Sequence, residues 1–272
     1  PQMFEAAISK ELKGLWIIGE DIVQTDPNSA HVIEAMNSLE LLVVQEIFMS
    51  ETAKLATVVL PGTTFLEKDG TFTNTERRIQ RVNRAVPPLP GTKPDGLIVT
   101  EMMQKLGFDQ PSYDADQVLA EIADVVPFFK GVTRERLGKL GLQWPVKEDG
   151  TDTQILHTET FKLGKGRLKN FDWKESSEIE ANQKDYPLIL TTSRVLQHYN
   201  AATMTRRTKN INIVDEDVLL IHPKDAAHRD LNTGDIGRLY SGRGEVALKV
   251  EVTDKVKEGI VFTTFHFPEH MV

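Results

Sequence analysis

The stretch TTSRVLQHYNAATMTRR, residues 191–207, concentrates side chains that can bind an anion. Arginine forms paired hydrogen bonds with phosphate oxygens, and closely spaced hydroxyl and amide groups can surround a pyrophosphate. Such donors recur through residues 193–207: Ser193, Arg194, His198, Thr203, Thr205, Arg206 and Arg207. The stretch favours binding of a phosphorylated ligand, and a basic surface loop without a ligand is the alternative.

A second candidate is the pair Gln45-Glu46 at the end of an apolar run. A carboxylate at this place could accept hydrogen bonds from the N1 and N2 hydrogens of a guanine, a geometry that adenine lacks. The alternative is that Glu46 is a solvated strand end or the partner of a helix dipole.

A third candidate is EKDGTFTNTERRIQR, residues 67–81. Asp69-Gly70 is a turn signal, and the threonine, asparagine and arginine side chains that follow suit a phosphate or a polar heterocycle. A structural alternative is equally open, in which Asp-Gly makes a hairpin and the arginines pair with surface acids.

A fourth stretch, TTFHFPEH at residues 263–270, places His266 between two phenylalanines. The imidazole could line a cofactor pocket, or it could be satisfied within an aromatic core cluster. His266 and His270 lack a matching carboxylate and a third ligand at metal spacing, so we expect no zinc site. The chain also lacks a phosphate loop, a nucleophile elbow and a Gly-x-Gly-x-x-Gly fingerprint.

Alternating apolar runs and helical patterns predict that the first third of the chain forms parallel strands joined by helices. The expected strands are 14–21, 39–48 and 57–62. Asp26 is expected to cap a helix that has Pro27 in its first turn, and Ser50 to cap a short helix. Ligands bind beyond the carboxyl ends of such strands. The residues expected at this rim are Gly19, Glu20, Asp21, Gln45, Glu46 and Ser50.

The remaining pattern predicts a two-domain chain. Residues 1–155 form an incomplete α/β domain whose helical connector, 87–150, carries apolar residues at helical spacing: Ile98, Met102 and Leu106, then Val118, Ile122 and Val126. Short strands and turns follow, so residues 156–272 are predicted to form a β-barrel with one short helix from Pro223 to Leu231.

Composition narrows the possible functions. The chain has 272 residues, a formal charge of −8 and no cysteine. The acidic balance argues against nonspecific nucleic acid binding, so an anionic ligand needs a local basic site. Absence of cysteine excludes disulfides, thiolate zinc sites and iron–sulfur ligands within these residues. No stretch resembles a signal peptide or a membrane span, and a cytoplasmic location is the expectation.

Read in order, four segments together resemble one family: the GED of residues 19–21, residues 43–80, residues 188–207 and the run from His222 to Pro268. They are similar to the C-terminal half of the formate dehydrogenase catalytic subunit, within the molybdopterin oxidoreductases. The resemblance implies a partial doubly wound parallel sheet followed by a double-psi, molybdopterin-dinucleotide-binding β-barrel, whose last strands are expected to be missing. It also implies a bis-molybdopterin guanine dinucleotide cofactor with molybdenum or tungsten.

The same resemblance implies which residues contact that cofactor. Glu46 and Ser50 stand where the family commonly has an aspartate and a threonine, and Glu46 becomes the guanine reader. The full set of expected cofactor contacts is Gly19, Glu20, Asp21, Glu46, Ser50, Arg194, His198, Asn200, Met204, Thr205, Arg206, Phe265 and His266.

The family's metal ligand, its 4Fe-4S cluster and its catalytic residues have no counterpart here, and we expect them in an N-terminal half of the same polypeptide. The resemblance implies formate and CO2 as substrate and product and electron-transfer subunits as partners, with no catalytic residue in this chain. Another family oxidoreductase, such as a nitrate reductase, is an alternative, although the MTRR run at 204–207 favours formate. A cofactor-free scaffold subunit of an electron-transfer complex is a second alternative.

Overall fold

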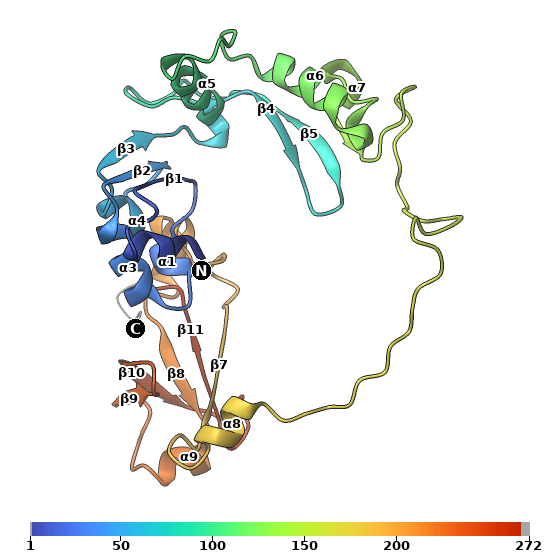
Figure 1. Cartoon of the computed structure of the whole chain (residues 1–272). Helices are drawn as coiled ribbons and strands as arrows, with labels where there is room; N and C mark the ends of the chain where they lie inside the picture. The colour runs from blue at the N-terminus through green and yellow to red at the C-terminus, as the bar shows by residue number, and fades with distance from the viewer. Residues whose placement is uncertain (1, 268–272) are drawn as a thin grey trace. The chain divides into compact units, whose positions relative to one another are not determined.

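The computed structural model describes residues 2–267. The chain divides into two compact units (Figure 1). The first unit comprises residues 1–44, 49–58 and 171–272, and the second comprises residues 45–48 and 59–170. Each unit is described by itself below.

The first part of the chain builds an α/β layer. Its sheet has the order β1-β2-β3, with strands β1 (Gly14–Ile18), β2 (Leu41–Glu46) and β3 (Val58–Pro61). The helices of this part are α1 (Gln2–Ile8), α2 (Ile22–Thr25), α3 (Ser29–Ser38) and α4 (Glu51–Lys54). Burial of apolar side chains such as Ile17, Val32 and Leu42 holds the helices to the strands. The strand–helix alternation predicted for this part is present.

The helix caps agree with the sequence at one position and differ at another. The hydroxyl of Ser50 accepts a hydrogen bond from the Ala53 N–H, so Ser50 caps α4 as predicted. The prediction for Asp26 is wrong, because Asp26 ends α2 and the side chain of Asn28 caps α3 by accepting from the His31 N–H. Asn28 is the cap because α3 begins two residues later than expected, after the extended backbone of Asp26.

The second unit contains an antiparallel sheet of order β4-β5-β6 (Gly70–Thr73, Arg78–Val82, Leu142–Gln143). Its helices are α5 (Asp95–Lys105), α6 (Ala115–Val125), α7 (Arg134–Leu137) and the short 3₁₀ turns η1 (Phe65–Glu67) and η2 (Pro127–Phe129). The core of this unit gathers Ile79, Leu119, Val132, Leu137 and Val146.

Two details of the second unit differ from the sequence prediction. Asp69-Gly70 leads into β4 and does not make the hairpin turn, which lies at residues 74–77. On α6 the buried residues are Leu119 and Ala123, whereas Val118 is 42% exposed, so the apolar face is turned by one residue from the predicted stripe.

Residues 144–176 of the structure contain turns but no helix or strand (Figure 1), and the peptide bond Trp144-Pro145 at their start is cis. Most of residues 155–176 are exposed. The short helix α8 (Ser177–Asn182) follows. Residues 155–176 are therefore irregular chain.

The last part of the first unit is a mixed sheet of order β7-β11-β8-β10-β9. Its strands are β7 (Ile189–Ser193), β8 (Val218–Ile221), β9 (Ile236–Tyr240), β10 (Glu245–Val252) and β11 (Ile260–Thr264). β7 pairs in parallel with β11 and β8 with β10, while β8–β11 and β9–β10 are antiparallel. The short helix α9 (Pro223–Ala227) begins at the predicted proline, and two 3₁₀ turns, η3 (Thr205–Arg207) and η4 (Lys209–Asn212), follow β7.

Among the described residues these five strands do not close into a barrel, because β7 and β9 are both edges. The core of this sheet is apolar and includes Leu219, Ile221, Leu248 and Val261. The architecture is thus mixed α/β, and the double-psi barrel remains a prediction.

Candidate functional site

The loop after β7 carries the basic stretch, and His198 holds it from within. His198 is 4% exposed, its Nε2 donates to the main-chain oxygen of Val214 at 2.8 Å, and its Nδ1 lies 3.0 Å from the Thr205 hydroxyl. The Thr205 hydroxyl also accepts from the Tyr199 N–H at 3.2 Å. The polar atoms of His198 and Thr205 therefore bind the loop to itself.

His266 makes the same kind of link from the end of β11. It is completely buried; its Nε2 accepts from the Val195 N–H at 3.2 Å, which leaves Nδ1 as the donor to the Asn200 oxygen at 2.8 Å. Burial lowers the pKa of His266 below its usual value, against the smaller opposing effects of the Asn200 carbonyl and Asp217. The ring centroids of His198 and His266 are 5.3 Å apart, so the two imidazoles pack together under the loop.

The two consecutive arginines at the end of the stretch reach the segments that follow β1 and β2. Arg206 donates from one guanidinium nitrogen to the Gln24 Oε1 at 3.3 Å, and Gln24 belongs to α2. Arg207 donates to the Met49 oxygen at 3.5 Å and to the Thr203 oxygen. The structure therefore brings the basic stretch to the part of the α/β layer just beyond two of its strands.

Arg194 lies at the other end of the stretch. Its guanidinium carbon is 5.7 Å from the centroid of the Phe265 ring, within the range of a cation–π contact, and the residue is exposed. Asn200 and Met204 are also exposed, and Met204 reaches 51% exposure. These three side chains are accessible to a ligand.

The predicted site residues at the end of β1 divide into two kinds. Asp21 is 5% exposed, and its carboxylate accepts from the Thr52 N–H at 2.9 Å, the Thr52 hydroxyl at 2.7 Å and the Glu51 N–H at 3.4 Å. Asp21 therefore anchors α4 to the end of β1. Gly19 and Glu20 are exposed, and Gly19 has a left-handed φ of 63°, which glycine adopts without strain.

The residues predicted at the end of β2 are partly used by the fold. The buried Ser50 caps α4, as described above. Glu46 is half-buried and one of its carboxylate oxygens accepts from the Ile47 N–H at 2.7 Å. Gln45 is buried and its amide donates to Asp95 at 2.8 Å, so it serves the second unit.

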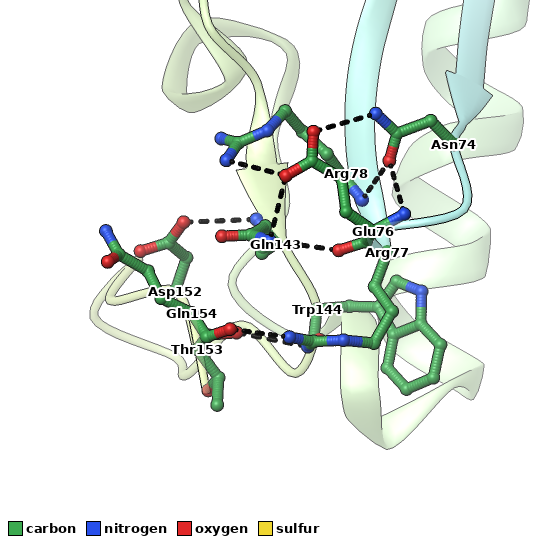
Figure 2. A network of polar contacts seen from close by, with 9 residues as sticks. All are labelled: Asn74, Glu76, Arg77, Arg78, Gln143, Trp144, Asp152, Thr153 and Gln154. Atoms are coloured by element: carbon green, nitrogen blue, oxygen red, sulfur yellow. Dashed lines mark hydrogen bonds and ion pairs between the residues drawn. The ribbon is translucent and has the colours of Figure 1, made fainter. Parts of the chain in front are cut away.

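The arginines of the stretch 67–81 make contacts within the fold. Figure 2 shows the Arg77 guanidinium donating to main-chain oxygens of Trp144, Thr153 (3.0 Å) and Gln154 (2.9 Å). Arg78 pairs with Glu76 at 3.4 Å. These contacts favour the structural interpretation of this stretch over a phosphate site.

The sequence pattern missed two buried polar residues, of which Gln24 contacts the basic stretch and Asp217 holds the residues at the end of β11. Gln24 contacts Arg206, and the carboxylate of Asp217 accepts from the Thr264 hydroxyl and from the N–H groups of His266 (3.4 Å) and Phe267 (3.3 Å). The available signal was a polar side chain directly beside an apolar one, Val23 before Gln24 and Val218 after Asp217.

Within residues 2–267 no group of three or more histidines, cysteines or carboxylates could hold a metal ion, and His270 lies outside the described residues. None of the described helices has the length and apolar character needed to cross a bilayer.

Comparison with known proteins gives a consistent assignment. The molybdopterin oxidoreductase family model matches residues 1–105, and the molydopterin dinucleotide binding domain model matches residues 188–271. Among solved structures, acetylene hydratase from Pelobacter acetylenicus has a similar fold, with a TM-score of 0.74 and 20% sequence identity over 98% of this chain and 40% of that one.

The two matches show that the chain belongs to the molybdopterin oxidoreductase family. It is similar to the alpha subunit of the F420-dependent formate dehydrogenase of Methanocaldococcus jannaschii, with 42% identity over 99% of this chain. It is equally similar, at 42% over 99%, to the alpha subunit of F420-dependent formate dehydrogenase 2 of Methanococcus maripaludis. The chain spans 40% of the length of each of these relatives.

Proposed function

We propose that the chain is the cofactor-enclosing C-terminal part of a molybdenum- or tungsten-dependent formate dehydrogenase, whose parent protein oxidises formate to CO2. The names of the two alpha subunits support the substrate. The observation that carries the proposal is the convergence of the basic stretch on the segments after β1 and β2, through Arg206 with Gln24 and Arg207 with Met49.

The residues present fit a bis-molybdopterin guanine dinucleotide. Arginines suit its pyrophosphates, because a planar guanidinium matches two phosphate oxygens and keeps its charge. We assign the direct contacts to the more accessible members of the predicted set: Gly19, Glu20, Glu46, Arg194, Asn200, Met204, Arg206 and Phe265. When bound, the group supplies the two-electron chemistry of its metal.

The other members of the predicted set, which are buried except for the half-buried Thr205, act through the backbone. His198, Thr205 and His266 hold the loop after β7, and Asp21 and Ser50 hold the start of α4. These five residues therefore fix the shape of the site, and the more accessible residues beside them contact the ligand. Fixing donors in advance favours binding because less side-chain freedom is lost when the ligand arrives.

Replacement of Arg194 and Arg206 by alanine tests the proposal. In a cofactor-binding protein, pterin retention collapses, whereas in a cofactor-free scaffold subunit assembly with partners is unaffected. Arg243→Ala is the matched control, because Arg243 is an exposed arginine of the same unit that pairs with Glu178. Equal pterin content in all three variants would contradict the proposal.

Several finer features belong to the same proposal. We infer a domain division at residues 155/156, a double-psi barrel over the second domain, and an upstream half of the polypeptide that carries the metal ligand and the 4Fe-4S cluster. Electron-transfer subunits as partners and a cytoplasmic location are part of it. The intact mass of the native polypeptide is the first check, since a value well above 30.6 kDa supports an upstream half.

A further inference from the structure

Gln24 joins three separate segments of the first unit through one side chain. It lies on α2 and is 5% exposed. Its Nε2 donates to the main-chain oxygens of Ala201 and, at 3.1 Å, of His266, and its Oε1 accepts from Arg206 at 3.3 Å. The amide thus uses both of its donor hydrogens and its acceptor, which a buried amide requires to avoid a desolvation penalty.

The segment that Gln24 holds has an unusual backbone. Asn200 and Ala202 have φ angles of 49° and 60°, in the left-handed region that residues with a Cβ rarely adopt. Such conformations persist only where the surroundings enforce them. Here two consecutive carbonyls are each held by a buried side chain, Asn200 by His266 Nδ1 and Ala201 by Gln24 Nε2.

The same turn sets the position of Arg206. The Arg206 N–H donates to the Ala202 oxygen at 2.9 Å, so its backbone follows the turn. Its guanidinium meets the Gln24 Oε1. Gln24 therefore fixes both the main chain that carries this arginine and the direction of its side chain.

We propose that Gln24 is a positioning residue for dinucleotide binding, which orients Arg206 toward a pyrophosphate by holding the turn at residues 200–202. This inference rests on the proposed function. It adds a residue outside the predicted contact set, with a role that acts through Arg206 and the Ala201 carbonyl.

The test compares Gln24→Met with wild type in the holoprotein, because methionine keeps the volume of the side chain and removes all three hydrogen bonds. Gln24→Glu is the second variant, in case methionine prevents folding, since it keeps the acceptor for Arg206 and loses the donor. Gln117→Met is the matched control, on the exposed surface of α6. Pterin release is followed by the fluorescence of the oxidised pterin.

We expect Gln24→Met to release pterin about tenfold faster than wild type, the size expected for losing one or two net hydrogen bonds. In an Arg206→Met background the same change should add less than about twofold, because coupled residues are not additive. If Gln24 has a purely structural role, the increases in pterin release rate caused by Gln24→Met and by Arg206→Met multiply in full. That result, or release from Gln24→Met at the wild-type rate, would overturn the inference while leaving the proposed function intact.

Hydrogen exchange of the pterin-free protein provides a second readout. Amides of residues 199–206 should exchange faster in Gln24→Met than in wild type or Gln117→Met, because the turn loses one of its two carbonyl partners. Unchanged exchange would overturn the inference. If the wild-type protein purified from its source contained no pterin, the proposed function would be refuted, and the role of Gln24 in dinucleotide binding would fall with it.

Discussion

The Nδ1–H of His266 donates a 2.8 Å hydrogen bond to the main-chain oxygen of Asn200, the first left-handed residue of the turn that leads to Arg206. The opposite nitrogen, Nε2, accepts from the Val195 N–H. Two points of the loop after β7, Val195 and Asn200, thus meet on one imidazole, and that imidazole must be neutral because Nε2 is an acceptor. The stability of this part of the fold is therefore linked to the protonation of His266.

We predict that the first unit becomes less stable on mild acidification because of His266. Burial holds its folded-state pKa below 6.5, the value for an unperturbed histidine; Asp217 opposes this effect, and His198 and Arg194 add to it. The unfolded chain therefore binds the proton more readily. The stabilisation is fully present above about pH 6.5 and is lost as the pH falls from there toward the folded-state pKa.

Denaturant unfolding at about pH 7.5 and about pH 5.5 measures this effect. His266→Gln provides the comparison, because an amide can donate and accept yet does not titrate in this range. The wild type should lose more stability between the two pH values than His266→Gln does. An identical loss in both proteins would exclude His266 as the linked group.

A second prediction separates the two acids at the end of β1. Asp21→Ala should lower the free energy of unfolding by about 1–3 kcal/mol, because the buried donors of Thr52 lose a charged acceptor. Glu20→Ala removes an exposed carboxylate that accepts from the Thr25 hydroxyl at 2.9 Å, and should change stability by less than about 0.5 kcal/mol. Pterin content, measured in folded protein, should instead fall more in Glu20→Ala than in Asp21→Ala, since Glu20 is assigned as a direct contact. Equal stability of the two variants would show that Asp21 does not anchor α4.

The sequence predicted the parts of the fold that depend on local chemistry. The strands β1 to β3 follow apolar runs, and the Ser50 cap follows from a hydroxyl before a short helical pattern. The hairpin turn was placed at the wrong dipeptide because Asn74 provides a stronger local signal, as its Oδ1 accepts from the Glu76 and Arg78 N–H groups.

The sequence predicted the residues of the candidate site as one set. Which of them are accessible to a ligand and which hold the fold depends on tertiary contacts. Arg194 and His198 are equally plausible ligands in the sequence, yet one is exposed and the other satisfies its nitrogens within the loop. The role of Gln24 could not be predicted from its apolar neighbour Val23 alone, because its partners Ala201 and Arg206 lie far along the chain and two of its bonds go to main-chain oxygens.

A third prediction concerns Asp95 in the second unit. Burial raises the pKa of this carboxyl, but hydrogen bonds from Lys68 and Gln45 and the charge of Lys68 outweigh burial and lower it overall. The stabilisation is present above the unfolded-state pKa and is lost as the pH falls through the folded-state pKa. Lys68→Met should raise the folded-state pKa of Asp95 and weaken this acid-induced loss. Unfolding midpoints between about pH 7 and about pH 3 report it, and an unchanged slope would contradict the assignment.

A fourth prediction concerns the guanidinium of Arg77, which ties the hairpin turn to the chain after β6. It donates to the oxygens of Trp144, Thr153 and Gln154 (Figure 2). Lysine keeps the charge but has a single nitrogen, which cannot span three carbonyls in the geometry of a planar fork. Arg77→Lys should therefore destabilise the second unit by about 1–3 kcal/mol.

Arg81→Lys is the control for that change, since Arg81 is exposed on the same strand and its guanidinium donates at 3.3 Å to Asn83, two residues away. Lysine at this position should shift stability by less than about 0.5 kcal/mol. Hydrogen exchange adds a local readout, because release of Thr153 and Gln154 should speed exchange in the segment after β6 in Arg77→Lys alone. If both variants lose the same stability, the loss reflects the general cost of replacing arginine on this hairpin, and the hydrogen bonds to the three carbonyls do not join the turn to the chain after β6.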